Sequence, residues 1–183
     1  MELALLLPGI HQGDPKYIGP GEVLFARAIG DGNIPLVKWL LARGFAIDGY
    51  VKGASTPLIL ATKNGNGAMA LYLITRGADV NFKRYNDSMS ALQLCITERN
   101  AELARILLEH GADPNSANNR NYTALHGAIG RCDVPTTLVL LEFGADPSLK
   151  NDRGETPRQG VVQCDSRESW DPGLAALSSL YAE

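Results

Sequence analysis

The chain carries three cysteines and three histidines, the residue types that most often bind metals or act as nucleophiles. Cys95, Cys132 and Cys164 form no closely spaced pair, and the histidines are scattered along the sequence. Zinc sites and disulfide frameworks have recognisable cysteine or histidine spacings, so we expect neither a metal site nor disulfides. Free thiols without a secretory signal indicate a reducing compartment, which predicts an intracellular protein in the cytoplasm or the nucleus.

No catalytic motif is evident either. The stretch Gly30-Asp31-Gly32-Asn33 resembles part of a phosphate-binding or calcium-binding loop. It lacks the Lys-Ser/Thr pair of the first and the spaced acidic ligands of the second, so we interpret it as a tight turn between helices. No serine or cysteine has an evident base partner. The sequence therefore predicts no catalysis and no cofactor.

The composition narrows the possible functions further. The 183 residues include 17 basic and 20 acidic side chains, a formal net charge of −3, and 45% are hydrophobic. These proportions suit a folded domain and argue against a disordered, collagen-like or coiled-coil chain. Nucleic-acid-binding domains are usually basic, so we expect no nucleic-acid partner. The apolar residues 1–7 end at Pro8-Gly9, far short of the ~20 residues of a membrane span, so we expect no membrane partner.

Two short motifs repeat along the chain with one common period. Gly-Ala-Asp occurs at residues 77–79, 111–113 and 144–146, and a degenerate copy lies at residues 44–46. The spacings are 33 or 34 residues. A second motif lies twenty-one residues before each of these glycines, and its clearest copies are Thr56-Pro57-Leu58, Ser90-Ala91-Leu92 and Thr123-Ala124-Leu125. The shared period indicates a tandem array of structural repeats.

Each repeated position has a role in a pair of helices. A hydroxyl residue before the first helix caps its first turn, and an Asn or Asp does the same before the second helix. A glycine after the second helix allows the positive φ that often ends a helix. Polar segments such as 81–88 and 115–122 are expected to form hairpin-like loops between units. The expected caps and helix-ending glycines are Thr56, Ser90, Thr123, Thr156, Asn33, Asn66, Asn100, Asp133, Gly44, Gly77, Gly111 and Gly144.

These units resemble ankyrin repeats, whose pattern is a Thr-Pro-Leu-His turn, two antiparallel helices and a Gly-Ala-Asp loop. The resemblance implies an all-α fold, an ankyrin-repeat solenoid of four to five stacked helix–turn–helix units with projecting β-hairpin-like loops. We expect a leader at 1–22, repeats at about 23–55, 56–89, 90–122 and 123–155, and a degenerate capping repeat at 156–183. The self-contained leader favours a whole protein over a fragment. His126, at the histidine position of the turn, is expected to bond the backbone of the adjacent loop.

The resemblance also implies a protein-interaction module that binds a partner protein or peptide through the concave surface of loops and first helices, without catalysis. We expect a monomer. The candidate contact residues are those that folding does not require, and they are rich in Tyr and Arg, as binding hot spots are. Their mixed arginines and carboxylates favour a partner with partly acidic patches. The predicted partner-binding residues are Tyr50, Lys52, Lys63, Arg84, Tyr85, Asp87, Met89, Glu98, Arg99, Asn119, Arg120, Tyr122, Arg131, Asp152 and Arg153.

A second hypothesis is small-molecule binding or an acid–base enzyme activity on the same concave face. Its candidate groups are Tyr85, Asp87, Tyr122 and Arg131, with Trp170 as a lid. A deep, enclosed pocket with strongly shifted titratable groups would favour this hypothesis, whereas an open groove favours a protein partner. A fold by itself does not choose between the two functions.

Overall fold

The computed structural model of the chain describes residues 19–51 and 55–159. Lys52, Cys164 and Trp170, named above, lie outside these residues. The chain divides into two compact units, residues 1–91 (unit 1) and 92–183 (unit 2). The described part of the chain contains eight named α-helices and no named strands, so the predicted all-α fold is confirmed.

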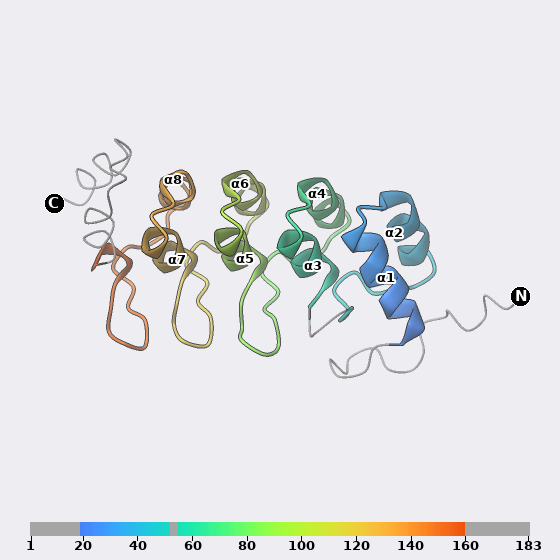
Figure 1. Cartoon of the computed structure of the whole chain (residues 1–183), viewed down its shortest axis with the longest axis horizontal. Coiled ribbons are helices and arrows are strands. Elements are labelled where there is room, and N and C mark those ends of the chain that lie inside the picture. Colours follow the sequence, from blue (N-terminus) through green and yellow to red (C-terminus); the bar gives the residue numbers. More distant parts are fainter. Residues whose placement is uncertain (1–18, 52–54, 160–183) are drawn as a thin grey trace, which may run out of the picture. The chain divides into compact units, whose positions relative to one another are not determined.

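Unit 1 contains two helix pairs, labelled in Figure 1. These are α1 (Pro20–Gly30) with α2 (Ile34–Leu41), and α3 (Pro57–Lys63) with α4 (Gly67–Thr75). Helix α1 packs against both α2 and α3, and α3 packs against α4. The start of α1 at Pro20 lies within the segment that the sequence assigned to the leader. The predicted caps are confirmed here, because Thr56 accepts a hydrogen bond from the Ile59 N–H, and Asn33 and Asn66 each accept one at 3.0 Å.

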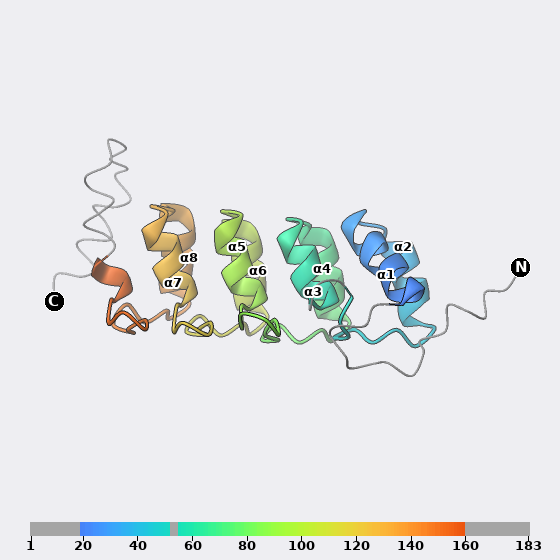
Figure 2. The ribbon, with the colours of Figure 1, turned by 60° about the horizontal axis from the view of Figure 1, so that its bottom comes forward.

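Unit 2 contains the next two pairs. These are α5 (Ala91–Thr97), which begins at the boundary between the units, with α6 (Ala101–Glu109), and α7 (Ala124–Gly130) with α8 (Val134–Glu142). Within this unit α5 and α7 form one layer and α6 and α8 a second, as Figures 1 and 2 both show. Helix α8 packs against α6 and α7. Asn100, Thr123 and Asp133 cap their helices as predicted.

Equivalent apolar positions form the core of each unit. Leu73 of α4 and Leu107 of α6 have no exposed surface, and neither does Cys95 of α5. A single repeat is too small to bury such a stripe, so the helices of neighbouring repeats bury it between them. Burial raises the pKa of the Cys95 thiol to about 12, which makes this cysteine a core residue and a poor nucleophile.

The connections between repeats are hairpin-like loops. An antiparallel bridge joins Lys83 to Ser90 in unit 1, and another joins Ala117 to Thr123 in unit 2. The first bridge encloses one residue more than the second. Gly77 and Gly111 end the preceding helices with φ of 92° and 88°, so the predicted need for glycine is confirmed. In Figure 2 the loop that follows α6 leaves the helices of unit 2 at one end of their axes.

Candidate partner-binding surface

The loop at 117–123 in unit 2 is shaped by one asparagine side chain. The Oδ1 atom of Asn118 accepts hydrogen bonds from the backbone N–H groups of Arg120 at 2.9 Å and Tyr122 at 3.0 Å. Asn121 takes a φ of 53°, a left-handed conformation that asparagine tolerates better than most residues. These bonds fix the backbone of the loop and leave the Arg120 and Tyr122 side chains available for contacts.

The next loop uses the same arrangement thirty-three residues later. The Oδ1 atom of Asn151 accepts from the N–H groups of Arg153 at 2.9 Å and Glu155 at 3.1 Å. The Nδ2 atom of Asn151 also donates to the Glu155 carboxylate at 3.0 Å. Asn151 is buried at the base of the loop, whereas Arg153 and Glu155 are exposed.

The two loops are bonded to each other. The backbone N–H of Asp152 donates to the Arg120 carbonyl at 3.1 Å, and the Asn121 side chain donates to the Asp152 carboxylate at 2.7 Å. These contacts hold the two loops of unit 2 in a fixed relative position, which is the rigidity that a binding surface needs.

His126, at the start of α7, connects both loops to the helix layer. Its Nδ1 atom accepts from the Thr123 N–H at 3.2 Å, so the proton of the neutral ring lies on Nε2, which donates to the Glu155 carbonyl at 3.1 Å. The predicted bond to the adjacent loop is therefore confirmed. Burial lowers the pKa of the His126 imidazole below its ordinary value and keeps the ring neutral. Gln93, one repeat earlier, donates in the same way to the Tyr122 carbonyl at 2.5 Å.

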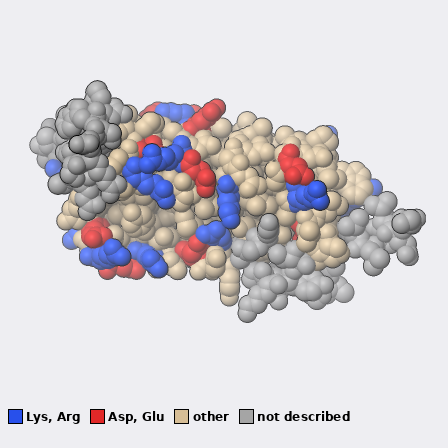
Figure 3. Space-filling model, viewed as in Figure 1, with Lys and Arg blue, Asp and Glu red and all other residues tan. Residues whose placement is uncertain are grey.

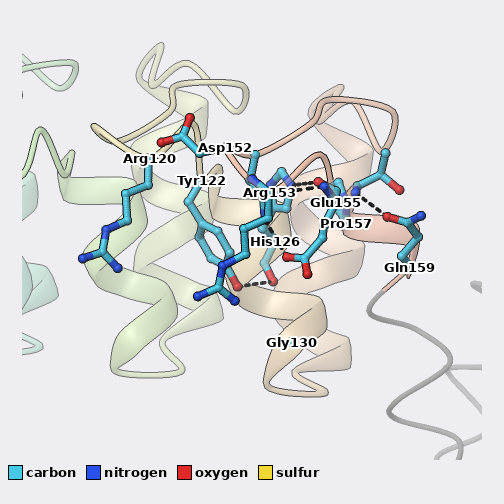
Figure 4. Close-up of a pocket in the computed structure, with 11 residues that line it drawn as sticks. Arg120, Tyr122, His126, Gly130, Asp152, Arg153, Glu155, Pro157 and Gln159 are labelled. Carbon is cyan, nitrogen blue, oxygen red and sulfur yellow. Dashed lines mark hydrogen bonds between the residues drawn. The ribbon is translucent and has the colours of Figure 1, made fainter.

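Tyr122 lies along α7 and is partly exposed. Its hydroxyl donates to the His126 carbonyl at 3.2 Å, and its ring stacks on the imidazole with 4.9 Å between centroids (Figure 4). The ring packs along two glycines of α7, where a Cβ at Gly130 would lie 3.4 Å from the hydroxyl and one at Gly127 would lie 3.8 Å from a ring carbon, both ordinary contact distances. The side chain keeps 37% of its surface exposed. Tyr122 is thus a rigid aromatic group with a free face.

A hollow of about 890 Å³ lies beside Tyr122. Its lining mixes arginines with carboxylates and amides from the two loops, α7 and the segment after Glu155, and Figure 4 shows these side chains. Most of the lining residues are exposed, so the part of the hollow that the described residues form is open to solvent. The lining residues are Arg120, Tyr122, His126, Gly130, Asn151, Asp152, Arg153, Glu155, Thr156, Pro157 and Gln159.

Charged groups around the hollow influence Tyr122. Burial is the main cause that raises the pKa of the Tyr122 hydroxyl, and the Glu155 carboxylate raises it further, whereas the positive charges of Arg131 and Arg153 lower it. These three charges are therefore close enough to the hydroxyl to act on it. We define the Tyr122 surface as Arg120, Tyr122, Arg131, Arg153 and Glu155. On the face in Figure 3, basic side chains gather over α5 and α7 of unit 2, with acidic ones among them.

The remaining predicted contact residues of unit 2 lie in the same layer of loops and first helices. Asn119 is exposed in the first loop, and Glu98 and Arg99 are exposed at the end of α5. The Arg99 guanidinium donates to the Arg131 carbonyl at 3.1 Å, which brings the ends of α5 and α7 together. Asp152 is exposed and bonded to Asn121, as described above.

The predicted contact residues of unit 1 differ in their exposure and in their contacts within the fold. Tyr50 is half-buried, with its ring packed edge-on against Phe82 at 5.9 Å. Arg84 is paired with Asp87 inside its own loop, and its guanidinium also contacts the Met89 sulfur at 3.6 Å. Tyr85 has 65% of its surface exposed, and Lys63 is exposed as well. Tyr85 and Asp87, two groups of the second hypothesis, belong to unit 1, whereas its other described groups belong to unit 2.

One prediction about the cysteines is wrong. Cys132, which follows α7, is disulfide-bonded, while Cys95 is free and buried. The sequence argument considered only short spacings such as CxxC, and a disulfide forms wherever two cysteines meet in space, however far apart they lie in the chain. The inference of a reducing compartment depended on free thiols, so it loses that support.

The structure also bears on metal and membrane binding. Over residues 19–51 and 55–159, no three or more His, Cys, Asp or Glu side chains gather in a group that would hold a metal ion. In the same residues no helix has the length and apolar character needed to cross a bilayer.

Three residues important for this surface were not singled out from the sequence. Asn118 and Asn151 shape the two loops, and Gln93 bonds the first of them from below. The thirty-three-residue spacing of the two asparagines was a usable signal, since both occupy the same position in their repeats.

Comparisons with known proteins agree with the repeat pattern. A family model described as ankyrin repeats (three copies) matches residues 5–84 and 82–151. An ankyrin repeat-containing protein of Treponema pallidum is 38% identical over 126 residues, which are 68% of this chain and 40% of that protein. An ankyrin repeat protein of fowlpox virus is 30% identical over 127 residues, 68% of this chain and 37% of that protein. The phosphocholine transferase AnkX of Legionella pneumophila is 29% identical over 151 residues, 62% of this chain and 16% of that protein.

The chain thus spans two fifths or less of the length of these relatives. The family match, in contrast, covers most of the chain and includes all eight described helices. Ankyrin repeats are generally protein-interaction modules. The matched model, the related sequences and the helix pairs with their hairpin loops together show that this chain belongs to the ankyrin repeat family.

Proposed function

We propose that the chain binds a partner protein or peptide, and that the Tyr122 surface of unit 2 carries this binding. The observation that supports the proposal most is a rigid, partly exposed tyrosine surrounded by arginines without ion-pair partners among the described residues. Tyr and Arg are the residue types most enriched in binding hot spots. The predicted contact residues of unit 2, Glu98, Arg99, Asn119 and Asp152, extend this surface.

The role is proposed to involve no catalysis. Both ring nitrogens of His126 are occupied by bonds within the fold, and the Cys95 thiol is buried with a raised pKa. The hollow beside Tyr122 is open, the feature expected for a protein partner and not for an acid–base enzyme. The match to the phosphocholine transferase covers 16% of that protein, so it carries no argument for the same activity here.

Affinity capture from cells of the source organism with the tagged full chain tests the proposal. The surface variant combines Arg120→Ala with Arg153→Ala, and the control combines Arg76→Ala, at the C-cap of α4, with Arg105→Ala in α6. The backbone bond between Arg120 and Asp152 survives in the surface variant, so its thermal midpoint should stay close to that of the wild type.

We expect a set of proteins captured by the wild type and the control and lost with the surface variant. Equal capture by all three chains would contradict the assignment of the surface. Failure of every chain to enrich any protein would contradict the proposed function itself.

A further inference from the structure

The guanidinium groups of the Tyr122 surface are unpaired within residues 19–51 and 55–159. Arg120, Arg131 and Arg153 form no ion pair with a carboxylate of the described residues, and their guanidinium groups donate no hydrogen bond there. They come from three different elements, the loop at 117–123, the end of α7 and the loop at 151–155. Three guanidinium groups with their donors unused present a surface that complements negative charge.

The carboxylates on the same surface are already engaged. Asp152 accepts from the Asn121 side chain at 2.7 Å, and Glu155 accepts from the Asn151 side chain at 3.0 Å. Both carboxylates therefore bond within the loops, and neither forms an ion pair with the three arginines. Both remain exposed, however, so they repel negative charge placed directly on them.

Because positive and negative groups alternate on this surface, they restrict how the negative charges of a ligand can be spaced. A continuous polyanion such as a nucleic acid would place phosphates against Asp152 and Glu155 as well as against the arginines. A ligand with separate negative charges avoids that repulsion. The open hollow and the exposed face of Tyr122 also fit an extended chain with side chains of mixed type.

We infer that the Tyr122 surface binds an extended acidic segment of a partner protein, in which separate Asp or Glu carboxylates pair with Arg131 and Arg153. Residues between these carboxylates contact the exposed face of the Tyr122 ring. Glu155 selects for spaced acidic residues, because a continuous acidic run would place a carboxylate against it. This inference rests on the proposed function and specifies the chemistry of the partner.

Selection from a random peptide library on the immobilised full chain tests the inference. A fluorescein-labelled copy of the most enriched peptide is then titrated with four chains, followed by fluorescence anisotropy. These are the wild type, a new surface variant with Arg131→Gln and Arg153→Gln, a new control with Arg76→Gln and Arg105→Gln, and Glu155→Gln. In this titration, 'surface variant' and 'control' refer to these glutamine substitutions. A labelled single-stranded DNA oligonucleotide is titrated in parallel.

We expect the enriched peptides to contain spaced Asp and Glu residues. Their affinity should fall by roughly tenfold or more in the surface variant, since a charge pair is lost at each arginine, and stay unchanged in the control. Glu155→Gln should tighten binding of the acidic peptide by a few fold, because it removes a like charge while the amide oxygen can still accept from Asn151. Binding should weaken as salt rises.

Three outcomes would overturn the inference. Neutral or basic peptides that still require Arg131 and Arg153 would leave the proposed function standing and remove the acidic specificity. Selected peptides that bind the surface variant as well as the wild type, or an absence of any selected peptide, would contradict this surface as a peptide site. DNA binding tighter than that of every selected peptide would show that the arginines serve a nucleic acid.

Discussion

The hairpin loops of the two units are held in different ways. In unit 1, the loop at 82–90 contains an internal ion pair, with Arg84 paired to Asp87 and the Asp87 carboxylate also accepting from the Met89 N–H. In unit 2, the loops at 117–123 and 151–155 are shaped by a buried or half-buried asparagine and bonded to each other. The arginine of the first loop is therefore paired inside its loop, whereas Arg120 and Arg153 of unit 2 form no ion pair with any described residue.

One side-chain position accounts for part of this difference. Gln93 and His126 each donate from the start of a helix to a loop carbonyl in unit 2. The equivalent residue in unit 1 is Ile59, which is buried but has no polar atom in its side chain to donate. Among the described residues, the loop over the apolar Ile59 contains an ion pair, and the two loops that accept from Gln93 and His126 contain arginines without one.

The largest effect is expected in the core, where the two units are alike. Leu73→Ala and Leu107→Ala, at equivalent buried positions, should each lower the free energy of unfolding by about 2–5 kcal/mol. Urea titrations of both variants measure the loss. A loss well below this range at either position would show that the apolar stripe of that unit is wrongly placed, and that the units differ in more than their loops.

The second-largest loss of stability is expected at His126, which donates a hydrogen bond to the loop at 151–155. His126→Leu removes the bond to the Glu155 carbonyl and leaves the Thr123 N–H without its acceptor, so it should cost about 1–3 kcal/mol. Ile59→Leu, at the equivalent position of unit 1, keeps an apolar side chain and should cost less than about 1.5 kcal/mol. Chemical denaturation of the two variants compares them. Equal losses would remove the distinction drawn between the two positions.

His126 should also make the stability of the protein depend on pH. Burial lowers the pKa of His126 in the folded state below its ordinary value of 6.5, so the unfolded chain takes up the proton first as the pH falls. The contribution of His126 is therefore fully present above pH ~6.5 and is lost on acidification. His126→Gln, which places at this position the residue found one repeat earlier at Gln93, keeps a donor that does not titrate.

Urea titrations at pH ~7.5 and ~5 of the wild type and of His126→Gln measure this effect. The wild type should lose more free energy of unfolding between the two pH values than the variant does. The comparison between the two proteins subtracts the carboxylates that also titrate in this range. An identical pH dependence in both would show that His126 takes up its proton equally well in the folded and unfolded states.

The smallest effect is expected at the ion pair of unit 1. Asp87→Asn removes a partly exposed pair with Arg84 and should cost about 0.2–1 kcal/mol, decreasing at high salt. Asp152→Asn in unit 2 keeps an oxygen that accepts from Asn121 and should cost less. Thermal denaturation at low and high salt gives both values. A larger loss for Asp152→Asn would reverse the comparison between the loops.

The helices and their caps could be predicted from the sequence because each depends on one residue type at one position. Thr56 and Asn66 bond within three residues of their own position, and Gly77 needs only its own φ. The loops could be placed but not described in detail. Whether an arginine is paired depends on which side chains the fold brings to it, so Arg84 and Arg120 looked equivalent in the sequence.

The contacts of the three loop tyrosines could not be predicted from the sequence either. Tyr50, Tyr85 and Tyr122 were predicted together as contact residues, yet Tyr50 packs on Phe82, Tyr85 is largely exposed and Tyr122 is stacked on His126. The disulfide at Cys132 was missed for the same reason, since contacts between residues far apart in the chain leave no local pattern. The sequence therefore predicts the repeat but not the neighbours of each exposed side chain.

Photo-crosslinking tests the central claim, that the Tyr122 surface is where the chain meets its partner. A photoreactive amino acid replaces exposed Asn119 beside this surface or, as the control, exposed Leu138 of α8 in the same unit. After irradiation in cell extract, we predict a protein adduct from position 119. This adduct should disappear when the same chain also carries Arg131→Gln and Arg153→Gln, and position 138 should give no such adduct. Adducts from position 138 alone, or adducts from position 119 that persist without the two arginines, would contradict the claim.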